Sequence, residues 1–452
     1  MKHSLLNATR VQSMKELLLI KDNLANRISY YHIMLLLLSL PFDRFYSHLI
    51  LASFAIHTLI QLKKGKVKPV FTLRTAVLLS VFLVTVVSTL YTINPAHAFI
   101  EWQLDLPILL FPLIMCFNPL DLKKYKSRFL LAFALCCTAT IIYLYADAFI
   151  TIRYYKMSWS SIMSPAFTNH NFSQPIDMHA TFFSMQIAIA LVYLLSVLIS
   201  EKLTLTNRIV YVICCLVLTA GIIQLSSKSV FVALFLVLNI AFPYFLIRGL
   251  RQKAYILISA SAFCILVLCI FSSHALKDRF LYELKEDLSP SFAGQTVEPR
   301  LERWKIAVKL IGESPVIGYG AGSEIQLLQQ QYFAKKFYSS YVHHLNAHNE
   351  YMSFMLKSGI WGLAVYLATL LYGFKKAIRK RDIVFFSFMV IIATVSLSEN
   401  VLDVDKGVIF YGFFFSFFVF SSEQKEHLNL PIKRHKYLRK VATKHEVVPS
   451  SL

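Results

Sequence analysis

Apolar runs of about 20 residues, each closed by a polar or charged cluster, recur along most of this chain. A helix needs about that length to cross the hydrocarbon core of a bilayer, so such runs predict transmembrane helices. Twelve runs are recognisable, centred near residues 34, 54, 83, 108, 140, 189, 216, 238, 264, 363, 390 and 414. With only 16% charged residues, the chain is also unlike a soluble protein, in which about a quarter are charged. We therefore expect an all-α polytopic membrane protein with about twelve transmembrane helices.

Lysine and arginine are distributed unevenly between these runs. The basic segments are 63–68, 123–128, 202–208, 248–253, 375–381 and the tail 425–444, whereas the turns between them are nearly free of basic residues. Short basic loops stay in the cytoplasm, so the alternation predicts that both termini are cytoplasmic. The same distribution explains the net charge of +21, and a nucleic-acid-binding function is therefore not supported.

The expected domain organisation follows from these two patterns. It comprises a cytoplasmic N-terminal segment (1–28), nine helices (29–273), an outer loop (274–349), three helices (350–421) and a basic cytoplasmic tail (422–452). The first 28 residues are polar and of mixed charge, so we expect no removable signal peptide. The outer loop has helical periodicity and is long enough for a small folded cap between the ninth and tenth helices. No internal repeat is visible, which disfavours an inverted-repeat transporter.

Two patterns that can signal chemistry are better explained by structure. All seven cysteines lie inside apolar runs, and the adjacent pairs Cys136-Cys137 and Cys214-Cys215 lack the C-x-x-C spacing of redox and zinc sites. We interpret them as packing residues. Asp403-Val404-Asp405 resembles the D-x-D of metal-dependent enzymes that use nucleotide sugars, but it falls in a short outer turn, where we expect both acids to be solvated.

The outer loop contains an arginine in a favourable place for an anion. A helix is expected to begin near Pro299 and to lay one apolar stripe, formed by Leu301, Trp304, Val308 and Ile311, against the membrane domain. Arg300 then lies at the positive end of the helix dipole, where a guanidinium and free N–H groups favour a diphosphate. Arg303 is a weaker candidate for the same work. The alternative for Arg300 is a salt-bridged surface arginine.

Two further segments of the loop are candidates for supporting the site. The turn from Ser314 to Gly322, with Gly318 and Gly320, lacks the spacing of a nucleotide-binding loop, so we expect it to let the backbone pass close to a ligand or helix. Downstream, His344 and His348 are spaced i,i+4, but no H-E-x-x-H pattern or nearby cysteine supports a metal site. An imidazole here can accept a proton from a sugar hydroxyl, and the alternative is a histidine that only caps the next helix.

Together these motifs resemble the bacterial O-antigen ligase and O-antigen polymerase family. The resemblance rests on Arg300-Leu-Glu-Arg-Trp304, on Pro315 with Gly318 and Gly320, and on His348-Asn349 followed by nine residues and Gly359-x-x-Gly362. The last of these is similar to the complete ligase signature. The twelve-helix layout and the large outer loop agree with the same family.

The resemblance implies a metal-independent, inverting glycosyltransferase without a cofactor in the bacterial inner membrane. It implies transfer of a glycan from undecaprenyl diphosphate to lipid A-core on the periplasmic face, as part of lipopolysaccharide biosynthesis. His348 is then the catalytic residue, and Arg300 and Lys228 bind the diphosphate. Supporting roles fall to Arg303, Trp304, Asn349, His344, Gly318, Gly320 and Gly359. Relatives often have an arginine where this chain has Lys228, and lysine keeps the charge but loses the bidentate fork.

Other functions stay open at this point. Within the family, a polymerase of glycan repeats and a transferase to protein hydroxyls share the same motifs, and the sequence leaves the glycan, the acceptor and the oligomeric state undetermined. Outside the family, a lipid-glycan flippase also has about twelve helices. Few ionisable residues are expected within the membrane, namely Glu101, Asp105 and Asp147, and this disfavours a flippase for an anionic glycolipid.

Overall fold

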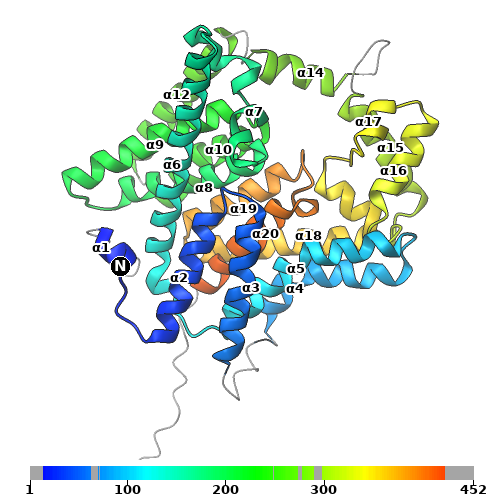
Figure 1. Ribbon diagram of the computed structural model, residues 1–452, viewed down its shortest axis with the longest axis horizontal. Helices are drawn as coiled ribbons and strands as arrows, with labels where there is room; N and C mark the ends of the chain where they lie inside the picture. Colours follow the sequence, from blue (N-terminus) through cyan, green and yellow to red (C-terminus); the bar gives the residue numbers. More distant parts are fainter. Residues whose placement is uncertain are drawn as a thin grey trace, which may run out of the picture.

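The computed structural model describes residues 14–62, 70, 72–247, 249–272, 277–289 and 298–422, and every regular element within them is helical (Figure 1). The predicted all-α class is therefore confirmed for this part of the chain. The basic segments 63–68 and 425–444 lie outside the described residues, so they do not enter the structural description.

The helices have the following bounds. In the first half they are α1 (Met14–Leu18), α2 (Leu24–Ser39), α3 (Arg44–Ile60), α4 (Leu73–Ser88), α5 (Pro95–Phe117), α6 (Leu122–Tyr154), α7 (His170–Ser173), α8 (Ala180–Ser200) and α9 (Leu205–Leu225). They continue with α10 (Lys228–Leu236), α11 (Phe242–Phe245), α12 (Leu250–Ser272), α14 (Glu283–Asp287), α15 (Arg300–Glu313), α16 (Glu324–Ala334), α17 (Tyr338–Val342), α18 (Glu350–Lys380), α19 (Ile383–Val395) and α20 (Asp405–Ser421). A π-helical segment, Val237–Ala241, joins α10 to α11.

Among the described residues, seven helical segments are long and apolar enough to cross a membrane. They are Leu73–Tyr91, Pro95–Phe117, Leu122–Tyr154, Ala180–Ser200, Leu205–Leu225, Lys228–Phe245 and Glu350–Lys380. Each of the twelve predicted centres lies inside a helix, but α2, α3, α19 and α20 have only 16, 17, 13 and 17 residues. An integral membrane protein is thus indicated, and the count of twelve spans stays a prediction.

The hydrophobic core is centred on α8, α19 and α20. An 18-residue window of α8 is 83% buried, as expected of a helix that is apolar on all sides. Phenylalanines of α20 stack on those of α19, for example Phe418 on Phe385 with ring centroids 5.3 Å apart. The other long helices pack around this centre and turn apolar residues outward, as lipid-facing helices do.

Helix ends that the charge pattern places on one side of the membrane also meet in the structure. At the ends expected outside, the His48 ring on α3 lies 2.8 Å from the Asp405 carboxylate on α20. At the ends expected inside, Lys126 on α6 forms an ion pair with Asp382, the residue before α19. The structure therefore supports the predicted alternation of the helices, while the side of each end stays a prediction.

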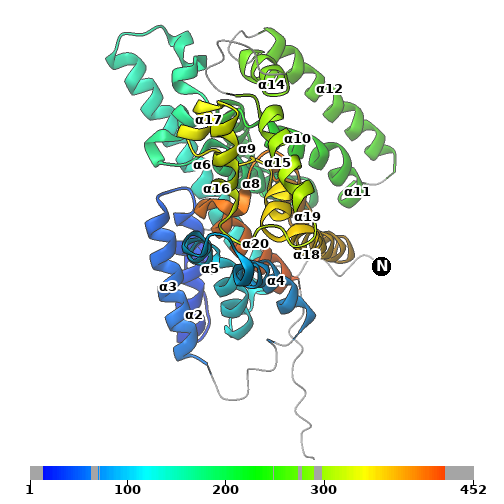
Figure 2. The same ribbon diagram turned by 90° about the vertical axis from the view of Figure 1, so that its right-hand side faces the viewer.

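Helices α15, α16 and α17 form a cap beside α4 and α5 (Figures 1 and 2). Helix α15 begins at Arg300 after Pro299, as predicted, but its buried face differs from the predicted apolar stripe, of which Ile311 packs against the core of the cap and Val308 does not. The side chains buried from α15 are Arg303, Ile306, Ala307 and Leu310, whereas Val308 is 56% exposed. The difference arises because α15 packs on α16 and on Leu356 of α18, which together form a small separate core.

The glycine-rich turn crosses α18 where that helix is broken at Gly359, which has φ 61° and ψ −156°. The broken helical hydrogen bonds are replaced by bonds to the turn, since Tyr319 N donates to the Leu356 carbonyl at 2.8 Å and Gly320 N donates to the Lys357 carbonyl at 2.8 Å. A Cβ on Gly359 would lie 2.3 Å from the backbone of Val316. The predicted close backbone passage is therefore confirmed, and the partner is a helix.

Candidate active site

Arg300 and His348 lie 48 positions apart in the sequence and share one carboxylate. The Nδ1 atom of His348 lies 3.2 Å from one oxygen of Glu399, and a guanidinium nitrogen of Arg300 lies 3.8 Å from the other. Arg300 also donates to the Ser398 carbonyl at 2.8 Å. The side chains of Arg300 and His348 are 27% and 26% exposed, so both stay accessible to a ligand. The structure thus brings the two residues to one place.

Glu399 is held in its charged form by this arrangement. Burial alone would raise the pKa of its carboxyl, but the hydrogen bond from His348 and the charges of His348 and Arg300 outweigh burial and lower it. A neutral imidazole that donates from Nδ1 to a carboxylate leaves Nε2 with the free lone pair. The arrangement therefore presents one histidine nitrogen as a proton acceptor beside a guanidinium.

The backbone around His348 is fixed by the cap and by the start of α18. His348 itself has a positive φ of 48°, which is uncommon for a residue with a side chain. Trp304 donates its indole N–H to the Ala347 carbonyl at 2.8 Å, and Asn349 caps α18 by accepting from Met352 N at 3.1 Å. These contacts fit the supporting roles expected of Trp304 and Asn349.

The other two polar residues expected to support the site lie elsewhere. Arg303 is only 4% exposed and points into the cap, where a guanidinium nitrogen lies 3.5 Å from the Asn346 carbonyl oxygen. His344 bonds to Gln329 of α16 and does not contact Arg300, His348 or Glu399 in any described interaction. Arg303 can therefore act on the site through the loop, and His344 takes part in packing of the cap.

Lys228 reaches the site through α14. Its ammonium lies 3.4 Å from Glu283, and Arg300 Nε lies 3.4 Å from Asp287. Glu283 and Asp287 are the first and last residues of α14, so they are spaced i,i+4 on one helical turn. Residues at this spacing lie on the same face with about 5–6 Å between their Cβ atoms. The two cations expected to bind diphosphate are thus linked through one short helix.

A pair of histidines lies on the side of the site formed by α8. The rings of His170 and His179 are 4.1 Å apart, and each Nδ1 accepts from a backbone N–H at 3.3 Å. The His179 side chain is exposed at the surface, although protein surrounds the ring closely enough to disfavour its charged form. This enclosure, with the charges of His170, His348 and Arg300, lowers the pKa of His179 to about 4 and outweighs the opposing charge of Glu399. His179 is therefore neutral at physiological pH.

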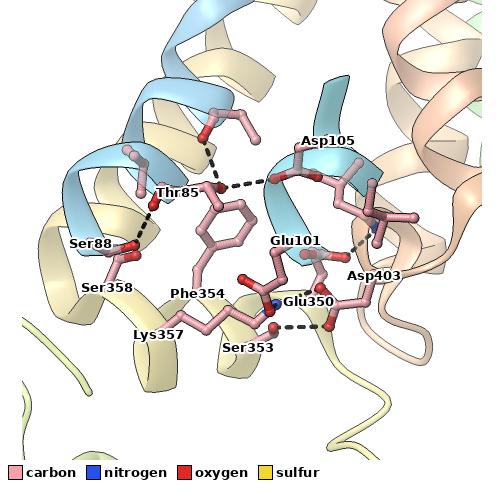
Figure 3. Close-up of a pocket in the computed structure, with 14 residues that line it drawn as sticks. Thr85, Ser88, Glu101, Asp105, Glu350, Ser353, Phe354, Lys357, Ser358 and Asp403 are labelled. Atoms are coloured by element: carbon pink, nitrogen blue, oxygen red, sulfur yellow. Dashed lines mark hydrogen bonds and ion pairs between the residues drawn. The ribbon is translucent and has the colours of Figure 1, made fainter. Parts of the chain in front are cut away.

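A second polar cluster lies next to the first, around Lys357 of α18 (Figure 3). The Lys357 ammonium lies 2.5 Å from Asp403 and 3.0 Å from Glu101 of α5, and all three side chains are at most 20% exposed. Asp105 and Glu350 line the same pocket. We call Lys357, Glu101, Asp403 and the buried Glu324 the lysine hub.

The lysine hub corrects two expectations. The acids of Asp403-Val404-Asp405 are not solvated, because Asp403 pairs with Lys357, and Asp405 pairs with His48 and lies 3.8 Å from Arg44. The membrane part also contains more ionisable residues than expected, since Glu350 and Lys357 both lie on α18.

The hub is linked to His348 by two backbone hydrogen bonds. Ala347 N donates to Glu324 at 3.0 Å, and Asn349 N donates to the side chain of Asn400 at 2.6 Å. Asn400 in turn donates to Asp403 at 2.6 Å, and Ser353 donates to Glu324 at 2.5 Å. The amides on both sides of His348 are therefore anchored to buried acids, directly or through Asn400.

Sequence reasoning missed Glu399 and Lys357. Glu399 follows an apolar helix at a turn, and nothing in its local pattern distinguishes it from a solvated acid. Lys357 gave a usable signal, because it is a lone cation within an apolar run and lies two helical turns after Glu350 on the same face.

Within the described residues, no group of three or more His, Cys, Asp or Glu is arranged to hold a metal ion.

Membrane-length helices, a helical cap, and an arginine and a histidine that share a glutamate define a polytopic membrane protein in which a guanidinium and an imidazole meet at one carboxylate. The family model described as O-antigen ligase matches residues 213–367, so this part of the chain is an O-antigen ligase domain. Members of this family are membrane glycosyltransferase-like enzymes of the ligase and polymerase type, which act on lipid-linked glycans. The match includes Lys228, Arg300 and His348, and it ends before Glu399. The chain matches no curated protein.

Proposed function

We propose that the protein is an O-antigen ligase-like glycosyltransferase that moves a glycan from undecaprenyl diphosphate to lipid A-core, at the periplasmic face of the bacterial inner membrane. The observation that carries this proposal is the shared contact of Arg300 and His348 with Glu399. A transferase that uses a diphosphate leaving group needs a fixed cation at the leaving group and a base at the acceptor, and this site provides both.

In the proposed step the acceptor hydroxyl donates its proton to Nε2 of His348. Its oxygen attacks the anomeric carbon of the glycan while the bond from that carbon to the diphosphate breaks, and undecaprenyl diphosphate leaves with the electron pair. Arg300 and Lys228 stabilise the charge on the leaving diphosphate. The attack is in line, so the configuration at the anomeric carbon is inverted. Glu399 stabilises the imidazolium formed on His348.

The sides of the membrane on which the cap and the termini lie follow from the proposed function. Two contacts between helix ends, His48 with Asp405 and Lys126 with Asp382, agree with alternating spans, and we propose that the cap and the site face the periplasm, with both termini in the cytoplasm. The domain boundaries at residues 28, 273, 349 and 421 are part of the same proposal. No step in this mechanism needs a metal or a cofactor, because the lipid diphosphate is already an activated leaving group.

The lysine hub does not favour the flippase alternative. Its acids Glu101, Asp403 and Glu324 outnumber its single cation, Lys357, and Asp105 and Glu350 line the same pocket. A path for an anionic glycolipid needs excess positive charge. The hub supplies one cation, which is already paired with Asp403 and Glu101, so it is better explained as support for the loop that carries His348.

The purified protein tests the proposed chemistry directly. His348→Ala is expected to lower the rate of glycan transfer by about 10²- to 10⁴-fold, the usual effect of removing a general base. His343→Ala is the matched control, because His343 is exposed in the same loop and its described hydrogen bonds stay within α17 and its end. Transfer at the normal rate by His348→Ala would show that the base is assigned wrongly.

A deletion strain separates the members of the family. Lipopolysaccharide with a complete core but no long chains indicates a ligase, which is the expected result. Core that bears a single repeat indicates a polymerase instead. Unchanged lipopolysaccharide with loss of a glycoprotein indicates transfer to protein, and either of these last two results would replace the proposed acceptor.

A further inference from the structure

The two cations assigned to the donor diphosphate are both paired with acids of one helical turn. Glu283 contacts Lys228 at 3.4 Å, and Asp287 contacts Arg300 at 3.4 Å. The helix that carries both acids, α14, lies at the top of the molecule between α12 and the cap in both ribbon views (Figures 1 and 2). Nothing in the proposed chemistry uses these acids, so their position needs a separate explanation.

Glu283 and Asp287 are more exposed than Glu399, the other acid that contacts Arg300. Glu399 is 15% exposed and is fixed by His348, whereas Glu283 and Asp287 are 44% and 32% exposed. Ion pairs at this exposure contribute little to stability and exchange easily. Helix α14 continues the π-helical segment Asp278–Tyr282, and the two ion pairs link it to α10 and α15.

We propose that Glu283 and Asp287 are displaceable counter-ions of the diphosphate site. They position Lys228 and Arg300 when no donor is bound, give way to the donor diphosphate, and return when undecaprenyl diphosphate leaves. This inference rests on the proposed function, because it assumes that both cations bind the diphosphate.

The chemistry of the two partners supports the exchange. A diphosphate carries negative oxygens on two linked phosphoryl groups, and two carboxylates at i,i+4 likewise offer two linked sites of negative charge on one face. Both can therefore pair with a lysine and an arginine whose counter-ions lie one helical turn apart. Because the acids and the diphosphate compete for the same cations, the acids weaken the binding of donor and product alike, and they assist release of the product after transfer.

Inorganic pyrophosphate tests the inference as a competitive inhibitor of transfer by the full-length enzyme. An exposed ion pair changes an equilibrium by up to about fivefold, so the double variant Glu283→Gln/Asp287→Asn is expected to bind pyrophosphate about 2- to 20-fold more tightly. Glu313→Gln is the control, because it removes a charge from an exposed ion pair at the far end of α15. Unchanged or weaker inhibition in the double variant would show that the acids only support the fold.

Hydrogen exchange on the wild-type protein gives a second measurement that does not depend on a variant. Pyrophosphate is expected to accelerate exchange of the amides of residues 283–288, because displaced acids no longer hold α14. Slower or unchanged exchange contradicts the inference. Arg300→Ala distinguishes a failure of this inference from a failure of the proposed function. If pyrophosphate still inhibits this variant at the concentration that inhibits the wild type, the assignment of Arg300 to the diphosphate site is wrong. If Arg300→Ala loses inhibition while the double variant is unaffected, only the role of Glu283 and Asp287 fails.

Discussion

Replacing Glu399 by glutamine tests whether this carboxylate assists the base. The substitution keeps the size of the side chain and removes its charge. In the structure Glu399 is 15% exposed and contacts His348 at 3.2 Å and Arg300 at 3.8 Å. The amide that replaces the carboxylate can still accept a hydrogen bond from Nδ1, but it cannot offset the positive charge that His348 gains when it takes the proton of the acceptor.

The size of the effect follows from this geometry. Two unit charges 4 Å apart attract each other by about 4 kcal/mol at an effective dielectric constant of 20, which sets the upper limit. Each 1.4 kcal/mol corresponds to about a tenfold change in rate, so the loss in kcat is expected to be about 10²- to 10³-fold. A carboxylate-to-amide change behind a catalytic histidine costs about 10⁴-fold where it also fixes the wrong tautomer.

The assay is transfer of a lipid-linked glycan to its acceptor by the purified protein, with kcat and KM measured separately. The KM for the donor is expected to stay the same or to fall, because Arg300 loses a competing anion. Glu313→Gln serves as the control for the loss of one negative charge. A kcat within about threefold of the wild type, in a Glu399→Gln protein with normal thermal stability, would refute the role assigned to Glu399.

Three further predictions concern stability. Lys357→Met leaves Asp403 and Glu101 buried without their cation, so the free energy of unfolding, measured by thermal unfolding in detergent, is expected to fall by about 3–5 kcal/mol. An unchanged free energy of unfolding would contradict the stabilising role assigned to the lysine hub. Gly359→Ala places a Cβ against Val316 at a residue whose backbone has a positive φ. We expect the free energy of unfolding to fall by about 1–3 kcal/mol or more in the same measurement, and wild-type stability would contradict the close crossing of the turn and α18. Burial raises the pKa of Glu298, but hydrogen bonds from the hydroxyl and backbone amides of residues 339 and 340 outweigh this and lower it below 4.5. The stability that this carboxylate gives to the cap is thus present above about pH 4.5 and lost as the pH falls through the lowered pKa. Hydrogen exchange of the α17 amides should therefore accelerate as the pH falls below about 4.5. Glu298→Gln should abolish this pH dependence.

Local signals were sufficient to predict the helices and much of the cap. Apolar length placed each of the twelve predicted centres inside a helix, Pro299 marked the start of α15, and the glycines of the turn at 314–322 indicated a close backbone crossing. Each of these signals depends on residues that are neighbours in the sequence. The apolar stripe of α15 was misplaced for the same reason, because which face is buried depends on Leu356, a residue of another helix.

Of the candidate site, the sequence predicted Arg300 and His348 but not the carboxylate that both of them contact. Arg300 and His348 stood out through family motifs, but Glu399 joins them from 51 positions beyond His348, and no local pattern indicates that contact. The lysine hub has the same property. Its members come from α5, α16, α18 and the turn before α20, so each one alone resembles an isolated charge, and only the packing of the helices shows that they compensate one another.

Fold and chemistry are coupled through a single pair of neighbouring residues. Glu399 holds the ring of His348, and the next residue, Asn400, holds the backbone of Asn349 and donates to Asp403 of the hub. Movement of the turn that contains this pair therefore shifts the base and its backbone together. Burying a lysine with several acids is costly unless each charge is compensated. Here the same compensation fixes the strained backbone of His348, so a variant of the hub should lower kcat even though no hub residue takes part in the proposed chemical step. Measuring kcat and unfolding on the same samples distinguishes misplacement of His348 from loss of folded protein.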